Sequence, residues 1–218
     1  MISDLDATIG QLLTKGAPPG SVLAGATISF ELPDSAWRAT IHGPTVNCYL
    51  YDIRENAALR THEPLTVRSP DGRQVTRIAA PVRVDCAYCI TAWSNVTPGA
   101  AFEEHNLLGE ILLVLLKNPT IPSAMLQGTL AGQIAPYPTV IASQDGVKNQ
   151  PEFWTALDQK LKPSLNYIVT MAVLLDALPA AAPTPFASVN IAAGQPGPPA
   201  PTDTQPLVSA PVFTITEK

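Results

Sequence analysis

TVNCYLYDIREN, residues 45–56, is the stretch that decides the fold. Its apolar residues alternate with polar or aromatic ones from Val46 to Tyr51, which predicts a half-buried strand. Charge then concentrates where the strand ends. Three interpretations of that end are open: an active site, a contact with a partner, or an ordinary solvated strand end. The residues concerned are Asp52, Arg54, Glu55 and Asn56.

The same alternation, followed outward along the chain, predicts a mixed, largely antiparallel sheet with helices packed on it, an α+β fold. The strands expected in this sheet are 26–32, 45–53, 65–78, 82–93 and 165–175, with a further short strand at 137–143. Within 65–78, Asp71-Gly72 is a strong hairpin signal.

Helical spacing of apolar residues predicts helices over 1–15 and 101–117, and a short helix from Pro151. Ser3 is the expected N-cap of the first helix. In the second, one apolar stripe is expected to contain Phe102, Leu108, Leu112 and Leu115, with Leu107, Ile111 and Val114 beside it.

Charged residues make up only 14% of the 218-residue chain, against about 25% in an ordinary soluble domain. Such a surface is common in proteins that bury much of it in an assembly. The formal net charge is −5, and the sequence has no run of basic residues. Nucleic acid and anionic membrane surfaces are therefore not expected as partners.

No membrane insertion is expected, because the most hydrophobic window, 107–118, is interrupted by Glu110 and is too short to span a bilayer. The N-terminal residues MISDLDATIG carry two acids and no apolar core, so they do not read as a secretory signal. Synthesis in the cytoplasm is the resulting expectation.

The three cysteines do not indicate a disulfide framework. Cys86 and Cys89 form a CxxC, but in a strand positions i and i+3 face opposite sides of the sheet. The two thiolates could share a metal only through a bulge. We therefore expect packed thiols and no metal site, and we expect no cofactor.

No nucleophile–base signature, P-loop or dinucleotide fingerprint is present, so the sequence does not indicate an enzyme. His105 follows Glu103 and Glu104 on the main helix, but adjacent helical residues point about 100° apart. A capping or interface role is expected for His105. Asp52 and Arg54 lie two apart and are expected to form a local ion pair.

The composition changes after Leu178, which divides the chain into a domain at 1–178 and a Pro-rich arm at 179–218. Nine prolines lie between Pro179 and Pro211, and such sequence favours extended, solvated conformations. The last island, LVSAPVFTITE at 207–217, alternates like a strand. The arm is either a disordered tail or a tether whose terminal strand pairs with another chain's sheet edge.

Several motifs occur in an order that resembles one family. They are GPTVNCYLYDIREN, PVRVDCAYCITAW, EEHNLLGEILLVLLKNPTIP and FWTALDQKLKPSLNYIVTMAVLL, of which LYDIREN is the most specific. The family is that of the cap or tube-terminator proteins of phage-tail-like extracellular contractile injection systems, and the similarity spans about residues 1–190. In KPSLNY (162–167), Lys162 stands where the family has a basic residue.

The resemblance implies an interaction protein that forms a ring, six-fold by the symmetry of the tube, on the distal end of the particle. Such a ring would stop growth of the inner tube and tie the tube to the contractile sheath. It implies that the charged end of LYDIREN faces a neighbour. His105 and Asn166 are further candidate interface residues. The competing interpretation is a buried ion pair that only holds the backbone in place where the strand ends.

Two other functional classes remain open at this point. A small-molecule or carbohydrate binding domain would need an apolar pocket lined by aromatics such as Trp37, Trp93 and Trp154, which are otherwise expected in the core or an interface. A hydrolase is disfavoured by the missing nucleophile–base signature.

Overall fold

The computed structural model describes residues 1–68, 75–132, 136–143 and 146–174. Helices and strands follow one another in the order α1 (Ile2–Gly16), β1 (Thr27–Ser29), α2 (Ser35–Arg38), β2 (Thr45–Glu55), β3 (Leu65–Arg68), β4 (Val75–Ile78), β5 (Val82–Trp93), α3 (Ala100–Lys117), β6 (Thr139–Ile141), α4 (Gln150–Ala156) and β7 (Leu165–Val173). Short 3₁₀ turns lie between them: η1 (Leu23–Gly25), η2 (Ala57–Leu59), η3 (Ser123–Met125) and η4 (Gly128–Gly132).

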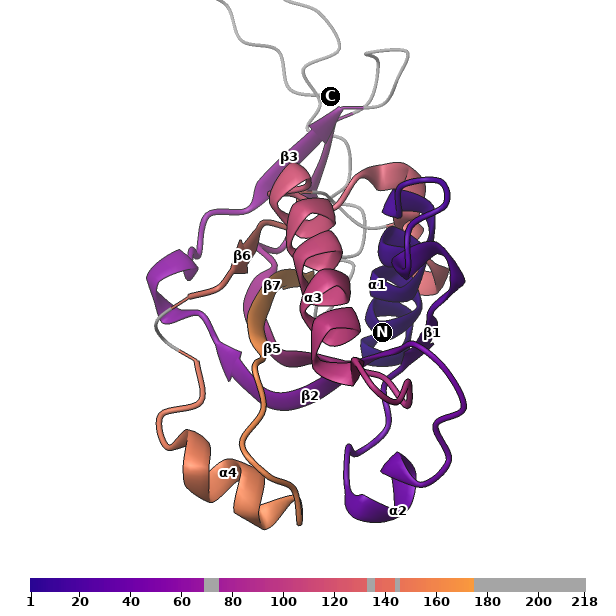
Figure 1. The fold of residues 1–218 in the computed structure, drawn as a ribbon. Coiled ribbons are helices and arrows are strands. Elements are labelled where there is room, and N and C mark those ends of the chain that lie inside the picture. Colours follow the sequence, from indigo (N-terminus) through magenta and orange to yellow (C-terminus); the bar gives the residue numbers. More distant parts are fainter. Residues whose placement is uncertain (69–74, 133–135, 144–145, 175–218) are drawn as a thin grey trace, which may run out of the picture. The chain divides into compact units, whose positions relative to one another are not determined.

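The main sheet has five strands in the order β1-β2-β5-β7-β6 (Figure 1). Only the β1–β2 pair is parallel, and the other three pairs are antiparallel. The expected mixed, mostly antiparallel α+β sheet is therefore confirmed. β5 is the longest strand and lies at the centre, because its 12 residues are apolar enough to be covered on both faces.

One expected member of this sheet lies elsewhere. Strands β3 and β4 pair antiparallel with each other, with Leu65 opposite Ile78, and form a two-stranded sheet of their own. The hairpin prediction was correct, but the placement in the main sheet was wrong, because two four-residue strands joined locally can pair with each other alone. Asp71-Gly72 lies outside the described residues. The hairpin belongs to a second compact unit of the chain.

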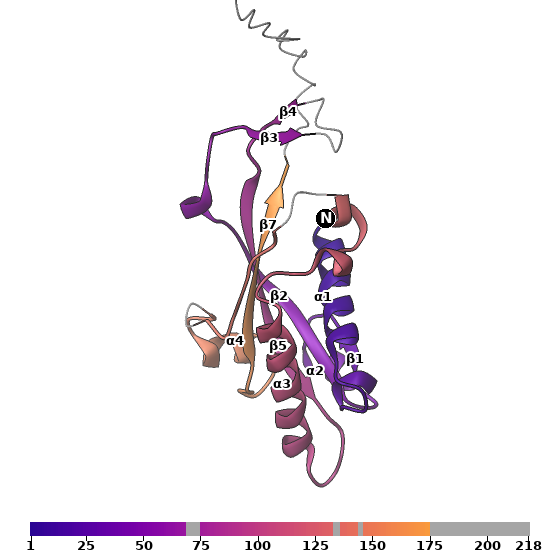
Figure 2. The same cartoon turned by 90° about the horizontal axis from the view of Figure 1, so that it is seen from above.

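Helices α1 and α3 cover one face of the main sheet (Figure 2). α1 begins at Ile2 with no side-chain cap, so Ser3 lies inside its first turn and the expected N-cap was wrong. On α3 the buried stripe consists of Leu107, Ile111, Val114 and Leu115. Phe102 was expected on the apolar stripe but is 73% exposed, because the adjoining stripe faces the sheet instead.

Short helices α2 and α4 pack on the opposite face. Their cluster contains Trp93 and Trp154, both buried, with Trp37 packed edge-on against Trp93 at a centroid distance of 5.4 Å. Trp93 and Trp154 are therefore core aromatics, as expected, and Trp37 is partly buried against them.

The CxxC cysteines confirm the alternation of β5. Cys86 packs in the cluster under α1 and α3, whereas Cys89 packs in the cluster under α2 and α4. The two thiols thus lie on opposite faces of the sheet, and neither is in a disulfide. Cys48 is also buried, on the α1/α3 side.

β1 is shorter than the predicted strand 26–32. It pairs with β2 only from Thr27 to Ser29, after which Phe30 leaves the sheet and packs near Gly10 of α1. Within the described ranges, no helix is long and apolar enough to cross a membrane.

Candidate assembly surface at the end of strand β2

The predicted ion pair is present at the end of β2. A β-bulge between Leu50 and Asp52 shifts the register against β5, after which Asp52 is opposite Ala87 and Arg54 is opposite Asp85. Arg54 Nε lies 2.6 Å from Asp52 Oδ2, with side chains 72% and 31% exposed. Because both groups retain contact with water, this pair stabilises the fold only weakly.

Glu55 has a partner that sequence reasoning missed. The η2 turn folds the chain back, and Asn56 caps that turn by accepting a hydrogen bond from the Leu59 amide at 3.2 Å. Arg60 thereby reaches Glu55 with both Nε and Nη2, at 2.7 and 2.6 Å. This fork-shaped pair holds the exposed turn against the end of the strand.

Asn56 also ties the end of β2 to two other strands. Its side-chain amide donates to Asp85 Oδ2 at 3.0 Å, and Thr170 Oγ1 donates to Asp85 Oδ1 at 2.6 Å. Asp85 is the only acid in the apolar strand VRVDCAYCITAW, and this isolated charge could have identified it as a site residue from the sequence. Thr170 gave no signal, because its proximity depends on the register of β7.

These polar residues form a charged surface that we define as Asp52, Arg54, Glu55, Asn56, Arg60 and Asp85. On β2, the contacts of the α2/α4 cluster stop at Tyr49 and Tyr51, immediately before this surface begins. Asp52, Arg54 and Asp85 therefore lie beyond the part of the sheet face that α2 and α4 cover. Glu55 is opposite Val84 and belongs to the other face.

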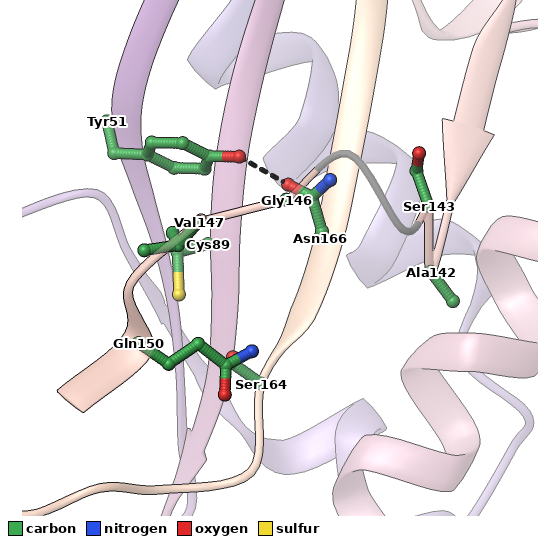
Figure 3. Close-up of a pocket in the computed structure, with 9 residues that line it drawn as sticks. All are labelled: Tyr51, Cys89, Ala142, Ser143, Gly146, Val147, Gln150, Ser164 and Asn166. Carbon is green, nitrogen blue, oxygen red and sulfur yellow. Dashed lines mark hydrogen bonds between the residues drawn. The ribbon is translucent and has the colours of Figure 1, made fainter. Parts of the chain in front are cut away.

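Asn166 adjoins the charged surface through Tyr51. The Tyr51 hydroxyl donates to Asn166 Oδ1 at 2.7 Å across a pocket of about 270 Å³ (Figure 3). Asn166 Nδ2 is buried and has no hydrogen-bond partner among the described residues. The pocket is lined by Tyr51, Cys89, Ala142, Ser143, Gly146, Val147, Gln150, Ser164 and Asn166.

The thiol and the phenol that line this pocket are uncharged near pH 7. Burial raises the pKa of the Cys89 thiol to about 11 and also raises the pKa of the Tyr51 hydroxyl. Both groups therefore stay protonated near pH 7 and supply neither a thiolate nor a base. None of the three tryptophans lines the pocket, so the aromatic site that a carbohydrate-binding domain would need is not formed by them.

Lys162, the basic residue of KPSLNY, has an internal role. Its ammonium pairs with Glu104 of α3 and lies 4.6 Å from the centroid of the Trp93 ring. The side chains of Lys162 and Glu104 are only 13% and 16% exposed, and burial lowers the pKa of Lys162 while Glu104 opposes that shift. The loop before β7 is thereby fixed to the start of α3.

His105 does not join the charged surface. It lies exposed on α3, on the side of the helix that carries Phe102, Leu113 and Leu116. These three apolar side chains are 73%, 56% and 56% exposed, and Gly109 between them has open space in place of a side chain. Sequence reasoning missed this exposed apolar face because it assigned Phe102 to the core.

No cluster of three or more metal-ligating side chains occurs in the part of the chain that the structure describes. Among the described residues, the six predicted site residues thus divide into a polar group at the end of β2, Asn166 beside it, and His105 on a separate surface.

Comparisons with known proteins give the following results. The family model of the Pvc16 N-terminal domain matches residues 4–188. The fold matches the sheath/tube terminator of PVC, an extracellular contractile injection system, solved in the extended state, with 22% identity and a TM-score of 0.59 over 88% of this chain. It also matches the tube-terminating cap of the anti-feeding prophage, with 22% identity and a TM-score of 0.57 over 88% of this chain.

The chain spans 63% and 62% of the lengths of those two proteins. No curated protein sequence matches it.

Proposed function

Because the chain belongs to the family of the Pvc16 N-terminal domain, we propose that it is a structural cap or terminator of a contractile injection particle. In this role it ends the inner tube and links the tube to the sheath. The observation that carries the proposal is the family match over residues 4–188, supported by the shared fold of a sheath/tube terminator and a tube-terminating cap.

The partners that follow are further copies of the chain, in a ring of six, together with tube and sheath proteins. In a closed ring, each subunit contacts its neighbours through two different patches. Two surfaces described above are candidates for such patches: the charged surface at the end of β2 and the exposed apolar face of α3. The low charge content of the sequence is also in keeping with a protein that buries much of its surface.

This role involves no catalysis and no cofactor. The pocket beside Tyr51 supports that reading, since its thiol and phenol stay protonated at neutral pH. It does not favour the alternative of a carbohydrate or small-molecule binding domain, because none of the three tryptophans lines it. Synthesis in the cytoplasm followed by incorporation into the particle completes the proposal.

Residues 179–218 act in this proposal as an arm attached to the terminator domain of residues 1–178. The terminal strand 207–217 docks on a neighbouring subunit or on sheath, tethered by the Pro-rich spacer. Truncation after residue 194 tests this point. If the shortened protein still forms stable rings and caps particles normally, the arm is only a tail.

Deleting the gene tests the proposed function as a whole. Particles should then show sheath and tube of uncontrolled length, or should not form, when their lengths are measured by electron microscopy. Native mass measurement of the purified chain, alone and with tube protein, tests the ring and its partner. Particles of normal length in the deletion strain would refute the proposal.

A further inference from the structure

The longest open sheet edge among the described residues belongs to β2. β1 pairs with β2 only over Thr45–Asn47, and no described strand pairs on that side from Cys48 to Glu55. Figure 2 shows β2 continuing well beyond β1. Burial falls along the strand accordingly: its first four residues are buried, the next four are partly buried and the last three are exposed. Along such an edge, every second residue directs its N–H and C=O groups outward, and on β2 the bulge between Leu50 and Asp52 interrupts this alternation once.

The opposite edge of the sheet is far shorter. β6 contains three residues, Thr139–Ile141, and the next residue, Ala142, has φ 53°, which ends the extended backbone. A left-handed conformation at a non-glycine residue cannot continue a ladder. β6 therefore offers few hydrogen bonds to an added strand, whereas β2 offers the seven residues Tyr49–Glu55, which are not fully buried and contain one bulge.

Much of the β2 edge lacks the usual protection against pairing. Natural edges are blocked by Lys, Pro, inward-pointing charge or β-bulges. Tyr49–Tyr51 contains no Lys, Pro or charge, and the strand's one bulge, between Leu50 and Asp52, separates these residues from the charged end. The charges of Asp52 and Arg54 offset one another in their ion pair, as do those of Glu55 and Arg60.

Strands β2 and β7 end at the same end of the main sheet. β2 and β7 both run antiparallel to β5, so they run in the same direction. Val173 of β7 is opposite Val82, and Glu55 of β2 is opposite Val84, two positions along the same strand. The 33 residues from 174 to 206 then precede LVSAPVFTITE. At about 3.1 Å per residue, a Pro-rich spacer of this length can span about 100 Å.

Pro211 determines which side of this segment can pair. In a strand, the N–H and C=O of one residue point to the same side, and those of the next residue point to the other. Pro211 has no N–H, so its side, shared with Phe213 and Ile215, is the poorer one for a ladder. The donors suited to pairing are those of Val212 and Thr214 on the other side.

We propose that residues 207–217 of one copy add as a strand to the free edge of β2, at 49–55, of a neighbouring copy. The pairing uses the backbone groups of Val212 and Thr214. It rests on the proposed ring, since each subunit then donates one strand and accepts another around a closed assembly.

Hydrogen exchange of the full chain tests the proposal. Val212→Pro with Thr214→Pro removes two donors on the pairing side, and Phe213→Pro with Ile215→Pro is the matched control with the same number of prolines. Those amides of 49–55 that point away from β5 should exchange at least about tenfold faster in the first variant than in wild type, and at the wild-type rate in the control. Protection in wild type should rise with protein concentration, because the donor is another copy.

A synthetic peptide of residues 205–218, added in excess to the first variant, should restore the protection. The same peptide N-methylated at Thr214 should bind at least about tenfold more weakly, whereas N-methylation at Phe213 should change its affinity by less than about twofold. Equal exchange in all variants would overturn the proposal. So would protection that does not change with concentration, which would place the strand on its own subunit.

These outcomes are independent of the terminator role. A deletion strain that makes particles of uncontrolled length, together with an edge that binds no peptide, would retain the proposed function and reject only the strand exchange.

Discussion

Replacing Arg54 by Ala separates assembly from folding at the charged surface. The Arg54 side chain is 72% exposed and its partner Asp52 is 31% exposed. A pair in such contact with water contributes about 0–1 kcal/mol to the free energy of unfolding. For a domain of this size, 1 kcal/mol corresponds to about 2–4 °C in Tm, so Arg54→Ala should lower the Tm of the isolated subunit by no more than that.

The same substitution should have a much larger effect on capping. If Arg54 is desolvated against a neighbouring protein in the particle, its removal costs about 2–5 kcal/mol of binding free energy. Even the lower value weakens binding about 30-fold. Sedimentation of the purified subunit with tube protein measures the apparent Kd, and electron microscopy of particles from a complemented deletion strain measures their length distribution.

Lys162→Met is the matched control for Arg54→Ala. It removes a cation whose side chain is only 13% exposed and leaves Glu104 without its partner. Breaking such a buried pair costs about 3 kcal/mol or more, so this variant should lose stability even as an isolated subunit. The reasoning about the charged surface fails if Arg54→Ala lowers the subunit's Tm as much as Lys162→Met does, or if it leaves capping unchanged.

Three further predictions concern stability. Hydrogen bonds from Thr129 hold the pKa of Asp4 at about 2, below its usual 3.8. The ionised Asp4 therefore stabilises the folded state above pH 3.8, and this stabilisation is lost as the pH falls through about 2. The Tm difference between wild type and Asp4→Asn should shrink over that range, and a constant difference would contradict this account. Gly128→Ala should destabilise by about 1–2 kcal/mol in urea titrations, because Gly128 has φ 54° and a Cβ there would lie 2.3 Å from Asp4 Oδ1. Gly109→Ala, in the exposed middle of α3 with open space around it, should stabilise by about 0.5–1 kcal/mol, and a loss of stability in the same titrations would refute that expectation.

Local patterns in the sequence predicted most of the fold. The alternation of β2 and β5 follows from side-chain periodicity, and it correctly placed Cys86 and Cys89 on opposite faces of the sheet. The hairpin 65–78 was also predicted, but its position relative to other strands depends on long-range pairing that no local pattern encodes. β1 was predicted too long because Phe30, directly after Ser29, packs near α1 and does not pair with β2.

The candidate site was predictable only where its partners lie close in sequence. Asp52 and Arg54 are two residues apart on one strand, so their pairing could be expected. Asp85 and Thr170 are 85 positions apart, and their contact depends on the register of β7 against β5. Phe102 shows a different limit, since helical spacing identifies an apolar stripe without specifying which neighbouring stripe faces the sheet.

The cysteines of the two sheet faces provide an intrinsic chemical reporter of how the layers separate. Cys48 and Cys86 lie under α1 and α3, and Cys89 lies under α2 and α4. Burial raises the pKa of Cys86 and of Cys89 to about 11, so all three should react slowly with alkylating reagents while the layers stay closed. Pulse alkylation followed by peptide mapping can therefore distinguish two events. Separation of α1 and α3 from the sheet would expose Cys48 and Cys86, whereas separation of α2 and α4 would expose Cys89.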